Sequence, residues 1–149
     1  MPLKEINIFD GENAFLSNFL ERIITFDNKK FRTNEHAFQW KKTLNSHEQS
    51  LIQNAKTPGQ SKREGRNCTL RKDWEQIKKQ VMFDIVMAKF SQHQDLKAKL
   101  LATGDAILIE GNVWHDNTWG NCTCNRCINI KGQNLLGLIL MQVRDLLNK

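Results

Sequence analysis

The segment from Asp73 to Ser91 carries the clearest structural signal in the chain, because its apolar residues recur at helical spacing. This pattern places one apolar stripe along a helix and predicts that the helix packs against a core. A second amphipathic segment, from about Leu135 to Leu147, predicts a helix near the end of the chain. Two such helices need further elements to cover their apolar faces, and shorter segments have to supply them.

The N-terminal third predicts short strands. Ile6 and Ile8 alternate with polar neighbours, which favours an extended segment. Residues 23–26 and 30–32 are rich in strand-forming side chains and flank a turn-like sequence at 27–29. This arrangement indicates a β-hairpin.

Further elements are indicated by helix-start residues and by apolar runs. Asn34 is a favoured N-cap, and Thr57-Pro58 combines an N-cap with proline at the first helical position. Residues 95–102 predict a short helix, residues 107–109 a buried strand, and residues 111–132 a polar loop. The fold class is therefore predicted as α+β, a compact and mostly helical single domain over residues 1–149 with a few short strands.

Length and charge limit the function classes. A chain of 149 residues favours one domain, and its net charge of +6 favours phosphate-bearing ligands. Charge alone fits nucleic acid and a small phosphorylated ligand equally well. No segment approaches the ~20 apolar residues of a membrane span, and the N-terminus lacks an apolar signal-peptide core. We therefore expect a cytoplasmic protein without a membrane partner.

Three of the four cysteines, Cys122, Cys124 and Cys127, cluster near the end of the polar loop. Bridges between such close neighbours would close only tiny loops, so reduced thiols or a metal site are favoured over disulfides. Zinc needs about four ligands, and Cys-x-Cys-x-x-Cys is not the usual pair of Cys-x-x-Cys motifs. We therefore expect a reduced loop without metal, with these three cysteines as ligands if zinc is present. The fourth ligand would then be one of Cys68, His93 and His115.

The first candidate site lies in residues 33–42. On a helix, Glu35, Gln39 and Lys42 share one face, and Phe38 lies near it. The helix dipole favours an ionised carboxylate in the first turn. Such a carboxylate is also common as a purely stabilising surface charge, and the sequence pattern alone favours that interpretation.

Two further segments could contact a ligand. Arg66 and Arg71 lie in basic stretches, and guanidinium groups suit phosphate oxygens, although a solvated basic surface explains them equally simply. Trp114 and Trp119 lie in the polar loop with Asp116 between them. An indole can stack on a base, or it can pin the loop to the core.

Taken together, several short segments resemble the NADAR family, because they occur in the order typical of its members. Each is weak alone, but the ordered set is specific and spans nearly the whole chain. The segments are Ser17-Asn18-Phe19, Glu35-His36-Ala37-Phe38-Gln39-x-x-Lys42, Gly65-Arg66, Leu70-Arg71-Lys72-Asp73-Trp74, Thr103-Gly104, Leu108-x-Glu110, Trp119-Gly120, Asn134-x-Leu136-Gly137 and Leu140-Met141-x-x-Arg144.

The resemblance implies an α+β fold with many helices and cleavage of N-glycosidic bonds without a cofactor. The implied substrates are ribosylaminopyrimidine phosphates of the riboflavin pathway, or ADP-ribose attached to guanine bases of DNA or RNA. The essential glutamate of the family falls on Glu35, its helix lysine on Lys42, and the acid before Trp-Gly on Asp116. Some members have a glycine-rich stretch where this chain has its cysteines, so the cluster is not required for the family's chemistry.

We therefore predict Glu35 as the main acid/base group and Asp116 as its partner, because paired carboxylates divide acid and base duties in glycosidases. Lys42 would either neutralise phosphate or attack the sugar and form a Schiff base. The alternative is a non-catalytic module that binds ADP-ribose or nucleic acid; the paired carboxylates favour an enzyme. The predicted substrate-binding residues are Asn18, Phe19, Gln39, Arg66, Arg71, Trp74, Trp119, Gly120 and Asn134.

Overall fold

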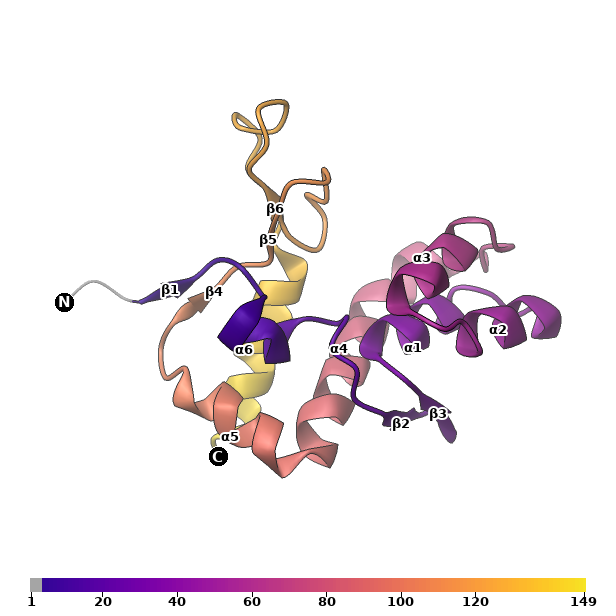
Figure 1. Ribbon diagram of the computed structural model, residues 1–149, viewed down its shortest axis with the longest axis horizontal. Coiled ribbons are helices and arrows are strands. Elements are labelled where there is room, and N and C mark those ends of the chain that lie inside the picture. Colours follow the sequence, from indigo (N-terminus) through magenta and orange to yellow (C-terminus); the bar gives the residue numbers. More distant parts are fainter. Residues whose placement is uncertain (1–3) are drawn as a thin grey trace. The chain divides into compact units, whose positions relative to one another are not determined.

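The computed structural model describes residues 4–149, and the chain divides into two compact units (Figure 1). One unit joins residues 4–17 with His93–Lys149, and the other consists of Asn18–Gln92. Each unit has its own buried apolar side chains. The single-domain organisation over residues 1–149 stays a prediction.

The Asn18–Gln92 unit begins with the predicted hairpin. Strand β2 (Ile24–Phe26) pairs antiparallel with β3 (Lys29–Phe31). Asp27 and Asn28 form the turn with φ angles of 51° and 63°. Asp and Asn tolerate this left-handed region, which the favoured two-residue hairpin turns require. The predicted hairpin is confirmed.

Four helices complete this unit: α1 (Asn34–Lys41), α2 (Ser46–Gln53), α3 (Pro58–Arg66) and α4 (Trp74–Gln92). Helix α1 packs against the other three, and every residue of it before Lys41 is buried. A short helix surrounded in this way presents side chains to the interior on all sides, including its polar ones. The buried polar residues of α1 therefore need partners inside the unit.

Two helix starts were predicted from capping residues, and one of them is shifted by one residue. Thr57 accepts a hydrogen bond from the backbone N–H of Gln60 and caps α3, as predicted. The N-cap of α1 is Thr33 rather than Asn34, because the Thr33 hydroxyl accepts from the backbone N–H of His36. Helix α2 was not predicted, because it is short, buries only Ile52 and so has little apolar periodicity.

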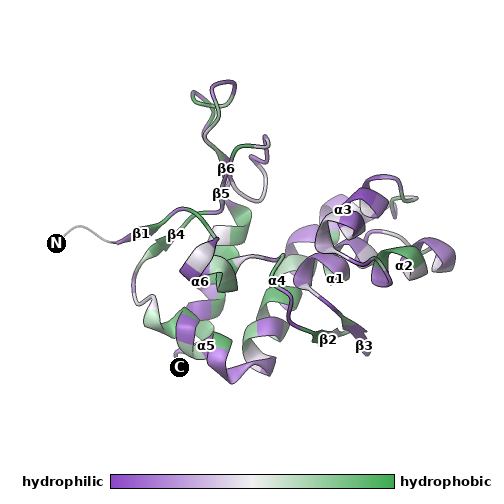
Figure 2. Ribbon diagram, viewed as in Figure 1, coloured by the Kyte–Doolittle hydropathy of each residue, from purple (hydrophilic) through white to green (hydrophobic). Residues whose placement is uncertain are grey.

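The other unit contains a two-stranded parallel pair and two helices. Strand β1 (Glu5–Ile6) pairs with β4 (Ile107–Leu108). Both segments were predicted to be extended, whereas their pairing was not predicted. Helix α5 (Gln94–Ala102) and helix α6 (Leu135–Leu147) match the predicted helices, and a 3₁₀ turn, η1 (Gly11–Leu16), precedes them. Figure 2 shows that α6 carries hydrophobic bands, whereas α3 in the other unit is mainly hydrophilic.

The predicted loop over residues 111–132 contains a small parallel pair. Strand β5 (Gly111–Asn112) pairs with β6 (Asn121–Cys122). These strands are too short and too polar to show alternation in the sequence. Among residues 4–149, no helix is both long and apolar enough to cross a membrane.

Candidate active site

Helix α1 holds the first candidate group. The Glu35 side chain lies in the first turn and is only 7% exposed. One turn later, Gln39 donates a hydrogen bond from Nε2 to Glu35 Oε1 over 2.8 Å. A carboxylate buried on a packed helix and held by a neighbour is unlike an ordinary surface charge. The observed burial thus removes the main reason for treating Glu35 as a stabilising surface residue.

Asn18 anchors the start of α1. Its backbone carbonyl accepts from the N–H of Glu35, and its Oδ1 accepts from Asn34 Nδ2 over 3.1 Å. Its own Nδ2 donates to Met82 Sδ on α4. The first N–H groups of a helix have no partner within the helix, so Asn18 satisfies one of them. Asn18 therefore positions Glu35, and its predicted contact with substrate stays a prediction.

Gly65 allows α3 to approach α1 closely at Gln39. A Cβ atom added at Gly65 would overlap Gln39 Oε1 and lie 2.7 Å from Gln39 Cδ. Gln39 Oε1 is buried and has no hydrogen-bond partner among the residues that the structure describes. Glycine at position 65 thus leaves the space in which Gln39 reaches Glu35. In the sequence, Gly65 stands out only as part of the Gly65-Arg66 motif.

Lys42 follows α1 and lies above an aromatic ring. Its Nζ is 5.6 Å from the centroid of Phe38, a distance suited to a cation–π contact. Burial lowers the pKa of Lys42 below its usual 10.5, and the Glu35 carboxylate acts in the opposite direction. Glu35, Gln39 and Lys42 therefore lie together, as the helical spacing predicts.

His36 is a buried residue of α1 that the sequence analysis did not assign. Its Nε2 lies 3.0 Å from the carbonyl of Ala55, which can only accept, so Nε2 carries the proton. Its Nδ1 then accepts from the Thr33 hydroxyl over 2.7 Å. Burial lowers the pKa of His36, in agreement with a neutral ring. His36 therefore ties α1 to the segment after α2.

The basic groups of this unit have different surroundings. Arg66 is exposed at the end of α3, and its positive charge contributes to lowering the pKa of Lys42. Phe19 is 42% exposed, with Lys62 Nζ 5.9 Å from its ring centroid. The half-buried Lys62 beside a partly exposed ring, together with the exposed Arg66 on the same helix, suits a ligand that carries both phosphate and a base.

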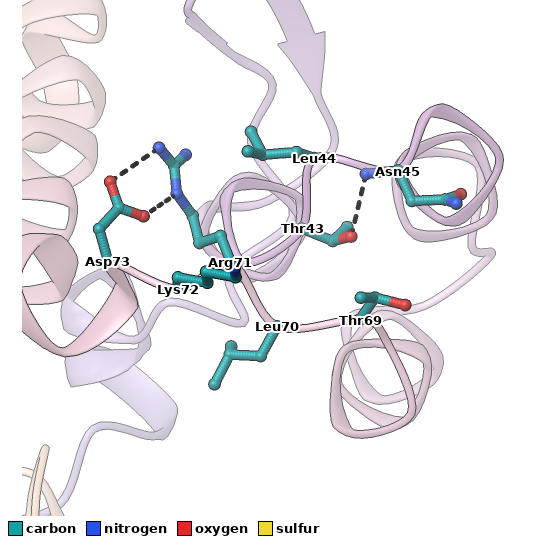
Figure 3. Close-up of a pocket in the computed structure, with 8 residues that line it drawn as sticks. All are labelled: Thr43, Leu44, Asn45, Thr69, Leu70, Arg71, Lys72 and Asp73. Carbon is teal, nitrogen blue, oxygen red and sulfur yellow. Dashed lines mark hydrogen bonds and ion pairs between the residues drawn. The ribbon is translucent and has the colours of Figure 1, made fainter.

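A pocket of about 460 Å³ is lined by residues 43–45, which follow α1, and by residues 69–73, which precede α4 (Figure 3). Its lining includes Leu44, Leu70 and Arg71, and Arg71 faces Asp73 across one side. Arg71 donates from Nε and Nη2 to the two carboxylate oxygens of Asp73, at 2.6 and 3.2 Å. This pairing lowers the pKa of Asp73. A phosphate would have to compete with the Asp73 carboxylate for the Arg71 guanidinium.

Trp74 is buried at the start of α4, and its ring packs 5.1 Å from that of Phe38. It thus supports the ring that lies under Lys42, and its predicted contact with substrate stays a prediction. The Asp73 side chain before α4 pairs with Arg71.

The remaining candidates belong to the other unit. Asp116 Oδ1 accepts hydrogen bonds from the backbone N–H groups of Thr118 and Trp119, at 3.1 and 2.9 Å. Asn112 donates to the Asp116 carbonyl and accepts from its N–H. The Asp116 carboxylate therefore shapes the turn that carries Trp119. Trp119 is half-buried, whereas Trp114 is 57% exposed.

Asn134 and Gly120 fix the start of α6. Asn134, with φ of 51°, accepts from the N–H of Glu110 and donates to the carbonyl of Leu108. A Cβ at Gly120 would overlap Glu110. The backbone carbonyls of Trp119 and Gly120 accept from the N–H groups of Leu136 and Asn134. These contacts were invisible in the sequence because they join segments far apart along the chain.

The structure therefore brings some predicted residues together and separates others by unit. Glu35, Gln39 and Lys42 lie together in the Asn18–Gln92 unit, while Asp116 belongs to the other unit, so the pairing of the two carboxylates stays a prediction. The loop that carries Asp116 also gathers four side chains of the metal-ligand type, His115 and the three clustered cysteines.

Known proteins resemble this chain over nearly its whole length. YbiA from Shigella boydii, an N-glycosidase, is 41% identical over 144 residues, which cover 94% of this chain and 86% of that protein. An N-glycosidase from Nostoc punctiforme is 38% identical over 134 residues, covering 87% and 82%. A riboflavin biosynthesis protein of Vibrio vulnificus is 35% identical over 138 residues, covering 91% of this chain but 36% of that longer protein.

The fold has a solved counterpart. The NMR structure of YbiA from Escherichia coli superimposes with a TM-score of 0.84 and 36% identity, covering 99% of this chain and 88% of that one. The predicted α+β, mostly helical fold and the predicted enzyme class are thus confirmed. The sequence pattern of the NADAR domain matches residues 8–148, and on this evidence the chain belongs to the NADAR family.

Proposed function

We propose that this protein hydrolyses the N-glycosidic bond between a base and a phosphorylated ribose or an ADP-ribose, with Glu35 as its principal acid/base group. The observation that carries the proposal is the buried Glu35 carboxylate, held by Gln39 on a helix that is itself buried. The relatives named N-glycosidases support the reaction class. The relative named a riboflavin biosynthesis protein supports a ribosylaminopyrimidine substrate.

The chemistry requires a group of this kind. Breaking an N-glycosidic bond develops positive charge on the sugar ring, while the departing base needs a proton or hydrogen bonds. A carboxyl group can supply that proton, or it can activate the attacking water. Gln39 fixes the orientation of the Glu35 side chain, and the carboxylate needs such fixing to act on one defined atom.

Lys42 supports the reaction in one of two ways. As an ammonium it would neutralise a substrate phosphate. As a free amine it would attack the anomeric carbon and displace the base, and the ring would open to a Schiff base that water then hydrolyses to free the lysine. Burial lowers the pKa of Lys42, which increases the fraction of free amine at neutral pH. This shift favours the nucleophilic role.

The charged surroundings support a phosphorylated substrate. Arg66 and Lys62 lie close enough to Lys42 for both charges to affect its pKa. Arg66 is exposed and can meet a phosphate without first breaking an ion pair, whereas Arg71 would have to exchange Asp73 for the phosphate. We therefore assign phosphate binding to Arg66 ahead of Arg71.

Asp116 enters the proposal through its position in the family motif. Its Oδ1 holds the turn that carries Trp119, so one of its roles is to position that tryptophan. The proposed partnership with Glu35 predicts a second effect on the chemical step. Asp116→Asn keeps an oxygen that can accept from the Thr118 and Trp119 N–H groups, so it separates the two roles.

One experiment tests the reaction and identifies the substrate class. The protein is incubated separately with an ADP-ribosyl-guanosine nucleotide and with a ribosylaminopyrimidine phosphate, and the released base is measured by mass spectrometry. We expect release from at least one of them, without added cofactor. Binding by calorimetry without release from either would contradict the proposal and support the alternative of a non-catalytic module for ADP-ribose or nucleic acid.

A further inference from the structure

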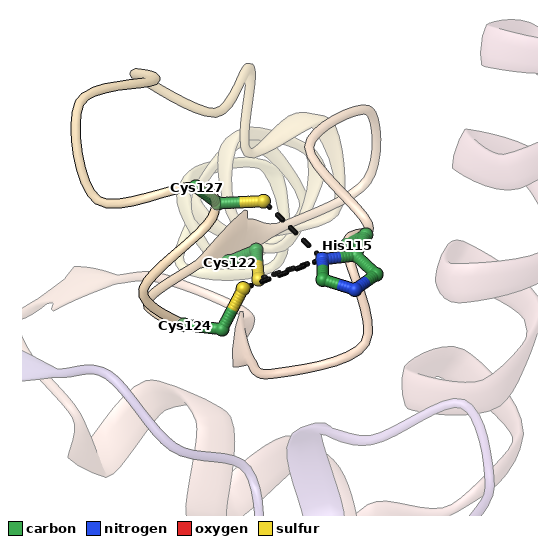
Figure 4. Close-up of side chains that lie close together, drawn as sticks. All are labelled: His115, Cys122, Cys124 and Cys127. Carbon is green, nitrogen blue, oxygen red and sulfur yellow. Dashed lines mark hydrogen bonds between the residues drawn. The ribbon is translucent and has the colours of Figure 1, made fainter.

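Four side chains of the 111–132 segment converge on one point (Figure 4). They are His115, Cys122, Cys124 and Cys127, and their ligand atoms all lie within 4.8 Å of one another. His115 Nδ1 lies 3.9 Å from Cys122 Sγ, 3.3 Å from Cys124 Sγ and 3.4 Å from Cys127 Sγ. All four cysteines of the chain are free thiols.

Hydrogen bonds do not explain this convergence. A neutral imidazole nitrogen has one lone pair or one proton, so Nδ1 can make one good hydrogen bond and cannot satisfy three sulfurs. A tetrahedral zinc ion does explain it. Zn–N bonds of about 2.0 Å and Zn–S bonds of about 2.3 Å place each sulfur roughly 3.5 Å from the nitrogen. The three observed distances lie on both sides of that value.

We propose that His115, Cys122, Cys124 and Cys127 form a structural Cys₃His zinc site. Three thiolates and one imidazole are the ligand set that zinc prefers, and four protein ligands leave no open position for catalysis.

The backbone around the cluster is arranged to hold the ligands. His115 has a φ of 69°, a left-handed conformation that a non-glycine residue adopts at a cost and that needs compensation from its surroundings. Cys122 lies on β6, and its N–H donates to Asn117 Oδ1 over 2.9 Å. The N–H of Cys127 donates to the carbonyl of Cys124 over 3.0 Å, which closes a tight turn between these two ligands.

Arg126 lies beside the cluster. Its Nη1 is 3.4 Å from His115 Nε2, a long contact in which the guanidinium can only donate. With zinc on Nδ1, Nε2 carries the proton and cannot accept from Arg126. Arg126 is exposed and can turn toward solvent. Its positive charge would still offset the net negative charge of three thiolates around one divalent ion.

The consequence concerns the turn that carries Asp116 and Trp119. The ligands His115 and Cys122 lie on either side of this turn, so zinc would close residues 115–122 into a short loop. We expected a metal-free loop because Cys-x-Cys-x-x-Cys supplies three ligands in an unusual spacing, and the fourth ligand was open among Cys68, His93 and His115. The structure supplies His115 as that ligand.

Metal analysis of the purified protein tests the site. Protein purified in reducing buffer should contain about one zinc per chain, the stoichiometry of a single closed site. After chelation, Co²⁺ should give the visible absorption of a tetrahedral thiolate complex, and zinc should abolish it. Cys124→Ser and His115→Ala should lose most of the bound zinc and lower the melting temperature. Cys68→Ser should keep the zinc, because the four proposed ligands complete the site without Cys68.

Wild-type protein that is fully reduced and yet takes up neither zinc nor cobalt at a stoichiometric level would overturn the proposal. Retention of a full zinc complement by both His115→Ala and Cys124→Ser would also overturn it. The cobalt measurement uses the wild-type chain, so poor folding of a variant does not affect it.

Discussion

Substitution of Gly65 by alanine is the most specific test of how the site is built. The added methyl group would overlap Gln39 Oε1 and lie 2.7 Å from Gln39 Cδ. Gly65 lies within α3, whose backbone cannot move away easily, so Gln39 has to leave its position. Its hydrogen bond to Glu35 Oε1 would then be lost. Gly65→Ala should therefore slow the reaction indirectly, because Glu35 loses the support of Gln39.

The size of the effect follows from that hydrogen bond. A hydrogen bond to a charged group contributes about 1.5–3 kcal/mol. If the bond orients Glu35 in the transition state, its loss lowers kcat/KM by roughly 10- to 100-fold, because each ~1.4 kcal/mol is a factor of ten. The effect on stability should be small, since the better helix propensity of alanine, about 1 kcal/mol, partly offsets the overpacking.

The assay compares kcat/KM and melting temperature for Gly65→Ala and for a matched control in the same helix. Gly59→Ala adds a methyl group whose nearest neighbour is Thr57 Oγ1 at 3.9 Å, an ordinary contact, and should leave kcat/KM unchanged. Gln39→Ala should lose about as much activity as Gly65→Ala, and the double variant little more. A folded Gly65→Ala protein with wild-type kcat/KM would refute the reasoning.

Three further predictions concern lysine and glutamate residues of the same unit. If Lys42 is a nucleophile, borohydride added during turnover traps a covalent sugar adduct that mass spectrometry detects, and Lys42→Arg abolishes this adduct. Turnover without an adduct would show that Lys42 binds phosphate instead. Burial lowers the pKa of Lys89 from 10.5 to about 7. The folded state therefore disfavours the charged lysine, and the free energy of unfolding should rise as the pH increases from about 7 to 10.5. Lys89→Met should raise the free energy of unfolding at pH 7 by at most ~4 kcal/mol. It should also reduce the difference between the free energies of unfolding measured by urea titration at pH 7 and at pH 9. The pKa of Glu48 is lowered by hydrogen bonds from Thr69 and Thr43. Glu48→Gln should therefore lower the melting temperature at neutral pH, and the difference should vanish in acid as the wild-type carboxylate becomes protonated.

The sequence was sufficient for elements with strong local signals. Helix α6 has the predicted bounds because its apolar face is continuous, and the hairpin β2–β3 forms around two residues that tolerate positive φ. The shared face of Glu35 and Gln39 also follows from helical geometry alone. In each case the spacing along the chain decides the contact.

Contacts between distant segments could not be predicted in this way. The short strands β5 and β6 exist because residues 111–112 and 121–122 pair with each other, and neither segment has a strand pattern by itself. The role of Gly65 depends on α3 lying against α1. The fourth ligand of the cysteine cluster, His115, was one of three candidates in the sequence, and only the fold selects it.

The division into two units bears on the acid/base pair. Sequence order places Glu35 and Asp116 in the motifs of one family, but each is fixed by contacts within its own unit. Asp116 forms two hydrogen bonds to loop amides, a structural duty that a motif does not reveal. A comparison of Asp116→Asn with Asp116→Ala would show how far the two duties overlap.

The most direct test of the central claim is the single-turnover rate of base release by Glu35→Gln. Glutamine keeps the size of the side chain and removes its ability to exchange a proton. We expect a loss of ~10²-fold or more in rate, the usual scale for an acid/base group, with little change in substrate affinity. Glu75→Gln, at an exposed glutamate of α4, serves as the control and should keep the wild-type rate. A Glu35→Gln protein that releases base at the wild-type rate would contradict the assignment of Glu35 as the acid/base group.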